Sequence, residues 1–507
     1  MSFNEILGGF MLFGMVAVIF IGFPISFTLL FLALVFGGIG LGWTQTFDLA
    51  YLQIWGTMKD EILPAVPLFI FMGYMTEQAG LMERLFGALR SLLAPVRGSL
   101  YLAVILTATI FAMATGIVGA AVTVLGIMAG PMMIKSNYDA RLSSGAIAAG
   151  GTLGILIPPS VMLVVMGPTM GVPVNLLYSA AFGPGVLLAG SYVLYTLTRS
   201  FINPKLGPAM TMEERKESYE QMTTEKVGWP VLALGFLCVV VIGGLVGTAI
   251  AGAVMPNLPG IGRSVVAAVL GVLGGYFYVT NAYFRAIMLG IAPLSALIGF
   301  TLGTILAGLA TPTEAASCGA FGAALLALLY GRLDFKAFKN ACVGTYTTSA
   351  MVLFLAVASN VFGAVFTKLG TAGVITNALV EMPLGDMWKL GLIMFLIFVL
   401  GWPFEWPAII LVFLPIFLPV IEKLKMTGLT KQELLIWFGA LVAVNLQTAF
   451  LSPPVAMSAY YLKNVVPQWS LMTIYKGMAD YMVIQCIVLA LIFFYPEISL
   501  WLVRAIK

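Results

Sequence analysis

The chain of 507 residues contains no histidine. Without histidine it cannot build a Ser-His-Asp set, and it lacks the usual proton carrier near neutral pH. Cysteine is also rare: Cys238, Cys318, Cys342 and Cys486 stand alone in apolar stretches, without a CxxC spacing. These two absences exclude the common zinc-site patterns, and the four thiols are predicted to be small buried hydrophobic groups.

Charged residues are scarce as well. They make up 9% of the chain, apolar residues make up 61%, and the formal net charge is only +4. A mean hydropathy of +1.04 is too high for a soluble domain, so we expect a polytopic membrane protein surrounded by the lipid bilayer. Nucleic-acid binding is not indicated. The GxxxxGK[ST] motif of ATP-driven proteins is absent, and no Ser-His-Asp or metal-hydrolase set is possible without histidine, so the sequence predicts no enzyme.

Apolar runs long enough to cross a bilayer occur in two similar series. The first half has predicted spans near 5–22, 24–43, 62–79, 141–168 and 173–198. The second half has equivalents near 286–309, 313–330, 344–366, 434–462 and 470–495. Between them lie a polar stretch at 199–226 and two extra apolar runs near 228–248 and 264–282.

The number of crossings predicts inverted repeats. An odd number of spans followed by an even insert makes the second half enter from the opposite face, and the excess of Lys and Arg on one side agrees with this. We therefore predict an all-α polytopic membrane protein in three parts. They are a first inverted repeat at 1–200, a cytoplasmic linker with two extra spans at 201–285, and a second inverted repeat at 286–507.

Two segments fit neither a span nor a loop. Residues 98–134 and 385–421 each contain two short apolar limbs around a polar or glycine-rich tip. We interpret them as re-entrant hairpins whose tips meet near the membrane midplane, although two tightly linked full spans remain an alternative. A short amphipathic stretch precedes each hairpin, at Leu81–Leu93 and Gly370–Val380. Each stretch suits a helix along the membrane interface or a plain connecting helix.

Two Pro-Pro breaks interrupt corresponding helices in the two halves, at Pro158-Pro159-Ser160 and at Pro453-Pro454. Proline lacks a backbone N–H, so each break frees carbonyl groups, which is tolerated in a membrane only beside a cavity. Duplicated breaks of this kind predict the substrate site of a transporter. Beside the first break stand Gly151, Thr152 and Gly154, and beside the second stand Gln447, Thr448 and Ser452. These groups suit a Na⁺ cage of neutral oxygens, although close helix packing would also explain the small residues.

Two carboxylates are predicted at membrane depth, where acids are costly. Glu314 follows Thr311-Pro312 at the spacing of a capping box, which favours a structural role. Glu405 lies in the tip of the second hairpin. It either tunes a cation site or holds the tip through hydrogen bonds.

Several motifs together resemble the large membrane subunit (DctM type) of TRAP transporters. They are Ala65-Val66-Pro67-Leu68-Phe69, Thr115-Gly116, the stretch from Gly151 to Ser160, Thr311-Pro312-Thr313-Glu314-Ala315-Ala316 and Pro415-Ile416-Phe417-Leu418-Pro419. The resemblance implies an elevator-type scaffold and transport domain, Na⁺ coupling, a small four-helix membrane subunit, a periplasmic binding protein that delivers an organic acid, and a place in the bacterial inner membrane. Carried over by position, it implies cation binding at Thr115, Gly116, Gly151, Thr152, Gly154, Gly401, Glu405, Gln447, Thr448 and Ser452.

The sequence departs from that family in three places. The first tip reads Ala-Thr-Gly-Ile-Val where a serine-rich run is usual, the second has Phe-Glu-Trp where an Asp is usual, and the two extra spans exceed the common form. A stand-alone ion-coupled carboxylate or anion carrier of similar inverted-repeat fold is the alternative function. A membrane-embedded enzyme or scaffold has no catalytic residues to support it.

Overall fold

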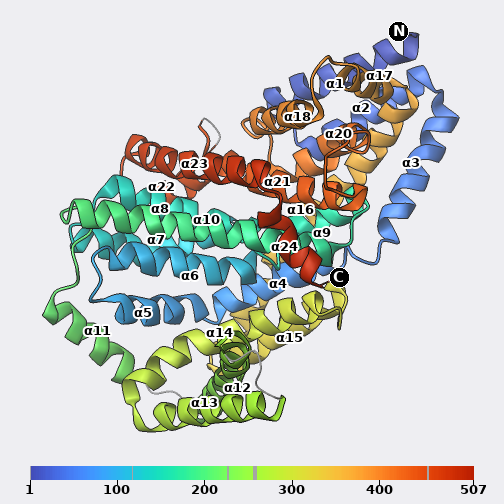
Figure 1. Cartoon of the computed structure of the whole chain (residues 1–507). Coiled ribbons are helices and arrows are strands. Elements are labelled where there is room, and N and C mark those ends of the chain that lie inside the picture. The colour runs from blue at the N-terminus through green and yellow to red at the C-terminus, as the bar shows by residue number, and fades with distance from the viewer. Residues whose placement is uncertain (1, 117, 225–227, 255–259, 454–455, 507) are drawn as a thin grey trace.

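The computed structural model describes residues 2–116, 118–224, 228–254, 260–453 and 456–506. Over these residues helices are the only regular secondary structure (Figure 1). Ten of the described helices are long and apolar enough to cross a membrane. The predicted fold class, an all-α polytopic membrane protein, is therefore confirmed.

The two halves contain the same series of elements: a helix pair, a long or broken helix, a short amphipathic helix, a hairpin, a broken helix and a closing helix. In the first half these are α1 (Phe3–Ile21), α2 (Ile25–Gly40), α3 (Trp43–Met58), α4 (Ala65–Gln78), α5 (Leu81–Leu93), α6 (Ser99–Thr115), α7 (Val118–Lys135), α8 (Ala140–Thr152), η1 (Leu153–Ile155), α9 (Val161–Met170) and α10 (Val174–Ile202).

The second half repeats the series as α14 (Ala282–Leu306), α15 (Pro312–Leu329), α16 (Phe335–Lys368), α17 (Thr371–Val380), α18 (Asp386–Leu400), α19 (Trp406–Ala408), η2 (Ile409–Phe413), α20 (Leu414–Ile421), α21 (Lys431–Leu451), α22 (Met457–Val465) and α23 (Leu471–Phe494), followed by α24 (Glu497–Ile506). The predicted hairpins are α6–α7 and α18–α20, and the predicted broken helices are α8–α9 and α21–α22. The limbs are not all as short as expected, because α7 has 18 residues.

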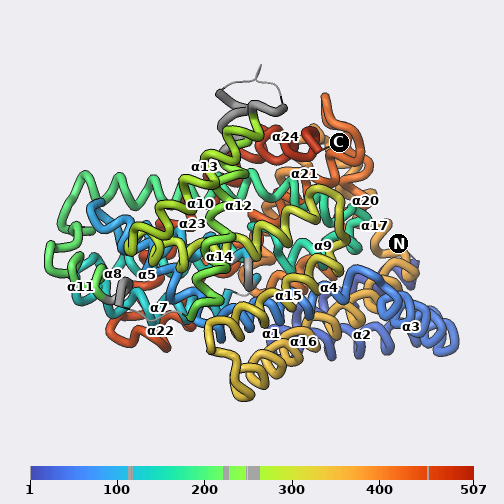
Figure 2. The backbone as a smooth tube through the Cα atoms, turned by 90° about the horizontal axis from the view of Figure 1, so that it is seen from below, coloured from blue at the N-terminus to red at the C-terminus, as the bar shows by residue number. Residues whose placement is uncertain are grey.

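The insert between the halves contains α11 (Met212–Thr224), α12 (Trp229–Val254) and α13 (Gly260–Thr280). The two extra predicted spans are thus helices, and they form a close pair. A Cβ added at Gly271 would lie 2.9 Å from the Val240 carbonyl oxygen, so glycine lets the two backbones approach. The pair lies at one edge of the molecule and contacts mainly α14 (Figures 1 and 2).

The element that differs most from expectation is α3, because its residues lie between the predicted spans at 24–43 and 62–79. Helices α3 and α4 together run along α16, so they are the counterpart of that continuous 34-residue helix. The pair is interrupted because the Asp60 carboxylate accepts the N–H groups of Ile62 and Leu63 at 2.8 and 3.1 Å, and Pro64 follows. Helix α4 alone has only 14 residues.

We divide the helices into two groups. In Figure 1, limbs α6 and α7 of the first hairpin lie with α8 and α10, whereas α18 and α20 of the second hairpin lie near α1 and α17. One contains the hairpins and broken helices, and α8 and α21 are almost entirely buried within it. Glycine again sets the packing distance, since a Cβ at Gly477 of α23 would lie 2.1 Å from the Arg141 carbonyl oxygen of α8. The other group holds α1–α4 and α14–α16. Helix α5 packs on both α6 and α14 and so connects the two groups.

The capping box predicted at Glu314 is present at the start of α15. The Thr311 hydroxyl accepts the Glu314 N–H at 3.3 Å, and the Glu314 carboxylate accepts the Thr311 N–H at 2.8 Å. This capping explains the carboxylate without a transport role.

We expect Thr311→Val to destabilise the protein by about 1 kcal/mol, because the variant leaves a helix N–H without its acceptor. Thermal unfolding in detergent would show this as a lower midpoint. Ser317→Ala is the matched control, since the Ser317 hydroxyl only donates to the Thr313 carbonyl within the same helix, at 2.8 Å. Equal midpoints for the two variants would contradict the capping assignment.

Candidate functional site

Each hairpin tip abuts the broken helix of its own repeat. Gly116, at the first tip, has a φ of +60°, and a Cβ there would lie 3.3 Å from Val161 Cγ2 at the start of α9. Gly401, at the second tip, is equally close to α21, because a Cβ there would lie 3.1 Å from the Ala449 Cβ. The sequence thus places small residues where the tips touch the helices, and both tips are in tight contact with the breaks.

The two tips also line one cavity of about 220 Å³, which we call the tip cavity. It contains two of the predicted site residues, Gly116 and Glu405. Val161 and Met457, which begin α9 and α22, line it together with Tyr461 of α22, and Thr348 and Val352 of α16 close it on the other side. Groups from both repeats therefore converge at one place against α16.

Glu405 is the acidic group of the tip cavity. It is the N-cap residue of α19, but its side chain makes no capping hydrogen bond. Over the residues that the structure describes, the carboxylate accepts no hydrogen bond from any other group either. Among the described residues, no hydrogen bond to Glu405 therefore holds the tip together, and its role at a cation site stays a prediction.

The first break is built from buried small residues. Gly151 permits contact with hairpin limb α7, since a Cβ there would lie 2.4 Å from Val122 Cγ2. Thr152 is 0% exposed, and its hydroxyl donates to the Ala149 carbonyl oxygen at 2.8 Å. Gly154 is buried within η1. Gly151 thus has a packing role, whereas the lone pairs of the Thr152 oxygen remain available as acceptors.

The proline segment of the first break is buried as well, at Pro158, Pro159 and Ser160. The Ser160 hydroxyl donates to the Ile155 carbonyl oxygen at 2.5 Å, and the Ser160 carbonyl accepts the Tyr178 hydroxyl at 3.3 Å. These bonds satisfy groups that the broken helix leaves without intrahelical partners. Ser160 therefore holds the shape of the break, and Val161, the next residue, is the one that lines the tip cavity.

The second break repeats the pattern with more side-chain oxygen. Thr448 is buried, and its hydroxyl donates to the carbonyl three residues earlier, that of Asn445, at 2.7 Å, as Thr152 does at the first break. The Ser452 hydroxyl donates to the Thr448 carbonyl at 2.7 Å. In each case the hydroxyl proton is used internally, so the oxygen can only accept, as a cation ligand must.

Gln447 is the most unusual group at the second break. Its side chain is 0% exposed, and neither the Oε1 nor the Nε2 atom has a hydrogen-bond partner among the described residues. A buried amide without partners costs about 1–3 kcal/mol, so such groups mark functional positions.

Of the remaining predicted residues, Pro453 is exposed in the turn, and Pro454 and the side chain of Thr115 lie outside the described residues.

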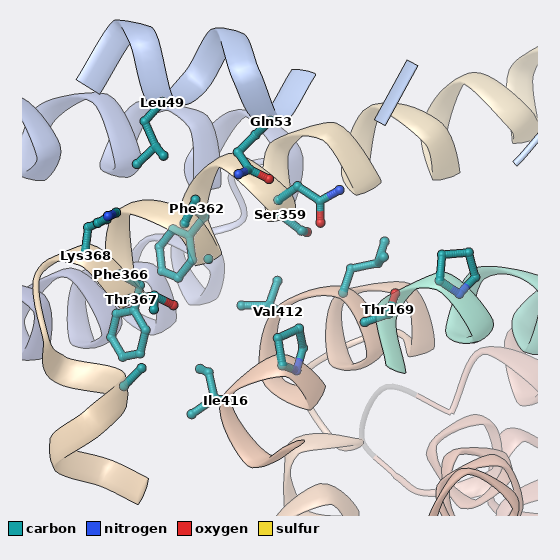
Figure 3. Close-up of a pocket in the computed structure, with 17 residues that line it drawn as sticks. Leu49, Gln53, Thr169, Ser359, Phe362, Phe366, Thr367, Lys368, Val412 and Ile416 are labelled. Atoms are coloured by element: carbon teal, nitrogen blue, oxygen red, sulfur yellow. The ribbon is translucent and has the colours of Figure 1, made fainter. Parts of the chain in front are cut away.

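Sequence reasoning missed a second, larger cavity of about 420 Å³ (Figure 3), which we call the α16 cavity. Its walls come from α3 (Gln53), α9 (Thr169), η2 (Val412) and the C-terminal part of α16 (Ser359, Lys368). A narrower cavity of about 180 Å³ shares Gln53, Pro168, Thr169, Asn360 and Leu411 with it. The two groups of helices are therefore separated by a row of cavities beside α16.

The lining residues of α16 recur at helical spacing. Thr348 and Val352 line the tip cavity, Ala356 lines the narrow cavity, Asn360 lines both the narrow cavity and the α16 cavity, and Thr367 lines the α16 cavity. Residues three and four apart lie on one face of a helix. This spacing of small and polar residues in an apolar helix is the signal that could have indicated the row of cavities.

Two hairpins and two broken helices that converge on a cavity between two groups of membrane helices define a membrane transporter built from inverted repeats. A comparison with known protein families identifies the family of the chain. Residues 12–498 match the family described as "Tripartite ATP-independent periplasmic transporter, DctM component", and the chain belongs to this family.

Individual relatives agree with this assignment at low identity. The chain is 25% identical over 502 residues to the sialic acid TRAP transporter large permease protein SiaM of Vibrio cholerae, which covers 97% of each chain. It is 24% identical to the C4-dicarboxylate TRAP transporter large permease protein DctM of Pseudomonas aeruginosa, over 89% of this chain and 88% of that one. The relatives are permease components of transporters, as expected for a protein that is not an enzyme.

A solved structure has a similar fold. The crystal structure of the YdaH transporter of Alcanivorax borkumensis covers 99% of both chains with a TM-score of 0.55, at 14% sequence identity. At this identity the likeness concerns the fold alone. It supports the architecture of the helices described above.

Proposed function

We propose that this chain is the membrane permease subunit of a binding-protein-dependent, Na⁺-coupled transporter that imports a small organic acid across the bacterial inner membrane. The observation that carries the proposal is the convergence of both tips and both breaks on one cavity against α16. The relatives named for sialic acid and for C4-dicarboxylates support a carboxylate as the substrate class. The partners would be a small four-helix membrane subunit and a periplasmic binding protein.

Two cation sites, one at each break, are part of this proposal. The Thr152 hydroxyl at the first and the Gln447, Thr448 and Ser452 side chains at the second supply neutral oxygens, with Gly116, Gly401 and Glu405 at the adjoining tips. Bound Na⁺ would supply positive charge beside the substrate carboxylate and couple its movement to the ion gradient. The residues at the breaks would hold the tips in place, and Pro158, Pro159 and Pro453 would keep backbone groups free for the substrate.

An elevator movement is part of the same proposal. The helices with hairpins and breaks would slide as one unit against α1–α4 and α14–α16, because the row of cavities beside α16 leaves their contact incomplete. Helices α5 and α17 would connect the moving unit to the fixed one, as amphipathic helices at the ends of both hairpins can.

The test is reconstitution in liposomes with the two partner proteins. With an inward Na⁺ gradient we expect uptake of sialic acid or of a C4-dicarboxylate such as succinate, and no uptake when choline replaces Na⁺. Uptake by this chain alone, at the same rate without a binding protein, would overturn the tripartite proposal and favour the stand-alone carrier.

A further inference from the structure

The α16 cavity contains polar groups that no predicted site uses. It lies between α3 and α16 on one side and α9 and η2 on the other (Figure 3). Its volume of about 420 Å³ falls in the range of small-molecule sites. Apolar side chains such as Phe362, Val412 and Ile416 form much of the lining, and a few polar groups stand among them. This composition is typical of a ligand site rather than of a packing defect.

The charge of the α16 cavity is positive. Lys368, the last residue of α16, is the charged side chain among those that line it, and it makes no ion pair within the described part of the chain. Figure 3 shows Lys368 at one end of the cavity and Thr169 at the other. An ammonium group without a carboxylate partner beside an open cavity attracts anions.

Three further side chains add hydrogen-bonding capacity. Gln53 of α3 and Asn360 of α16 carry amide groups, and the Asn360 Nδ2 donates to Thr57 Oγ1 at 2.8 Å, which uses one of its two protons. Ser359 is 1% exposed, and its hydroxyl oxygen has no hydrogen-bond partner among the described residues. Figure 3 shows Gln53 and Ser359 on the same wall. A buried hydroxyl without a partner at the wall of a cavity indicates a ligand that supplies the partner.

Along α16, the narrow cavity lies between the α16 cavity and the tip cavity. Val165 and Ala356 line the narrow cavity, and Val161 and Val352, one helical turn away on α9 and α16, line the tip cavity. The acidic groups on this path are Asp60 in the narrow cavity and Glu405 in the tip cavity. The Asp60 carboxylate already accepts two backbone N–H groups. Its charge is therefore partly compensated. In the α16 cavity itself, an anion would meet the positive charge of Lys368.

We propose that the α16 cavity is an entry site for the substrate, in which Lys368 attracts a carboxylate and Gln53, Asn360 and Ser359 bind the polar groups of the same organic acid before it reaches the tips. This inference rests on the proposed function. It assigns a binding role to the fixed group of helices, in addition to the breaks.

The first experiment measures the charge of the cavity without transport. The four cysteines are replaced by serine, and Ala364, which lines the cavity one turn before Lys368, becomes the reporter Ala364→Cys. The reporter is labelled with an anionic and with a cationic methanethiosulfonate reagent. We expect Lys368→Gln to lower the ratio of anionic to cationic labelling rate by roughly fivefold, because loss of one charge slows the first reagent and speeds the second. Lys368→Arg should keep the ratio.

The second experiment measures succinate or sialic acid uptake in the reconstituted system. We expect Lys368→Gln to raise KM about fivefold while kcat stays within about twofold, since the lysine acts on arrival and not on the movement. Lys339→Gln is the matched control, because Lys339 is an exposed lysine near the other end of the same helix. It should change neither the labelling ratio nor KM.

The outcomes separate the two proposals. An unchanged labelling ratio, or an unchanged KM with a changed ratio, overturns the entry site even if Na⁺-driven uptake is found. Lack of uptake by the unmodified protein, together with a fivefold change in the labelling ratio, overturns the proposed function and supports an anion-attracting cavity. A KM that rises equally in Lys339→Gln assigns the effect to general surface charge and also overturns the entry site.

Discussion

Gln447→Met is expected to leave the protein folded, and more stable in Na⁺-free buffer, while it removes most of the response to Na⁺. Methionine has a similar length and flexibility and needs no hydrogen bond, so it fills the space without the unpartnered amide. Removal of such an amide should stabilise the fold by about 1–3 kcal/mol. If the Gln447 oxygen is a Na⁺ ligand, the apparent Na⁺ affinity should fall at least about tenfold.

Thermal unfolding in detergent checks both halves of this prediction. The unmodified protein should gain stability as Na⁺ is added in place of choline, because a ligand that binds only the folded state shifts the midpoint upward. The variant should start at a midpoint as high or higher and gain little. In the liposome assay, the Na⁺ concentration for half-maximal uptake should rise in parallel.

Thr107→Val is the matched control for Gln447→Met. The Thr107 hydroxyl is buried in α6 and has no hydrogen-bond partner among the described residues, as for the Gln447 amide, but it is not a predicted cation ligand. The control should gain stability and keep the Na⁺ response. A full Na⁺ response in Gln447→Met would remove this residue from the cation site, whatever the change in stability.

The parts of the fold that the sequence predicted best are those where proline interrupts an apolar helix. The breaks after Ile157 and Ser452 and the two hairpins were found because proline and glycine interrupt apolar runs at corresponding places. The amphipathic helix at Leu81–Leu93 matches the prediction at both ends, since its charged and apolar residues alternate at helical spacing. Glu314 was correctly predicted as a capping residue for a similar reason: a cap is a local interaction.

Helix α3 was missed because its hydropathy is low and several of its apolar residues are aromatic. Trp43, Phe47, Tyr51 and Trp55 recur every four residues and stack in pairs along one exposed face. Polar residues stand between them, so the segment resembles a loop when only apolar length is counted. The spacing of four was the available signal for a helix.

The α16 cavity could not be predicted for a different reason. Asn360 and Lys368 belong to an unbroken helix, whereas the sequence signals of function lie at the breaks and tips. Their role depends on which other elements line the cavity, namely α3, α9 and η2, and these come from distant parts of the chain. The helical spacing of small and polar residues marks this face of α16, but it does not specify which helices lie against it. The inward face of α16 therefore became interpretable only with the structure.

Gly116→Val is expected to reduce uptake by at least about tenfold, with the protein still folded. Gly116 has a φ of +60°, a conformation that costs a residue with a Cβ about 1–2 kcal/mol and a β-branched residue more. In addition, the first added carbon would lie 3.3 Å from Val161 Cγ2 and 3.5 Å from the Val161 N atom. The first hairpin tip would be displaced from α9, and with it the wall of the tip cavity.

Gly171→Val separates the effect of backbone strain on uptake from the effect of a lost contact between the tip and α9. Gly171 ends α9 with a φ of +63°, but a Cβ there would meet no atom within 4 Å. The conformational strain is thus nearly the same, whereas the contact between tip and broken helix is untouched. Uptake per folded molecule, with folded protein quantified by size-exclusion chromatography, should fall strongly only for Gly116→Val. Equal uptake in the two variants would mean that the tip contact is dispensable, because strain is the property that they share.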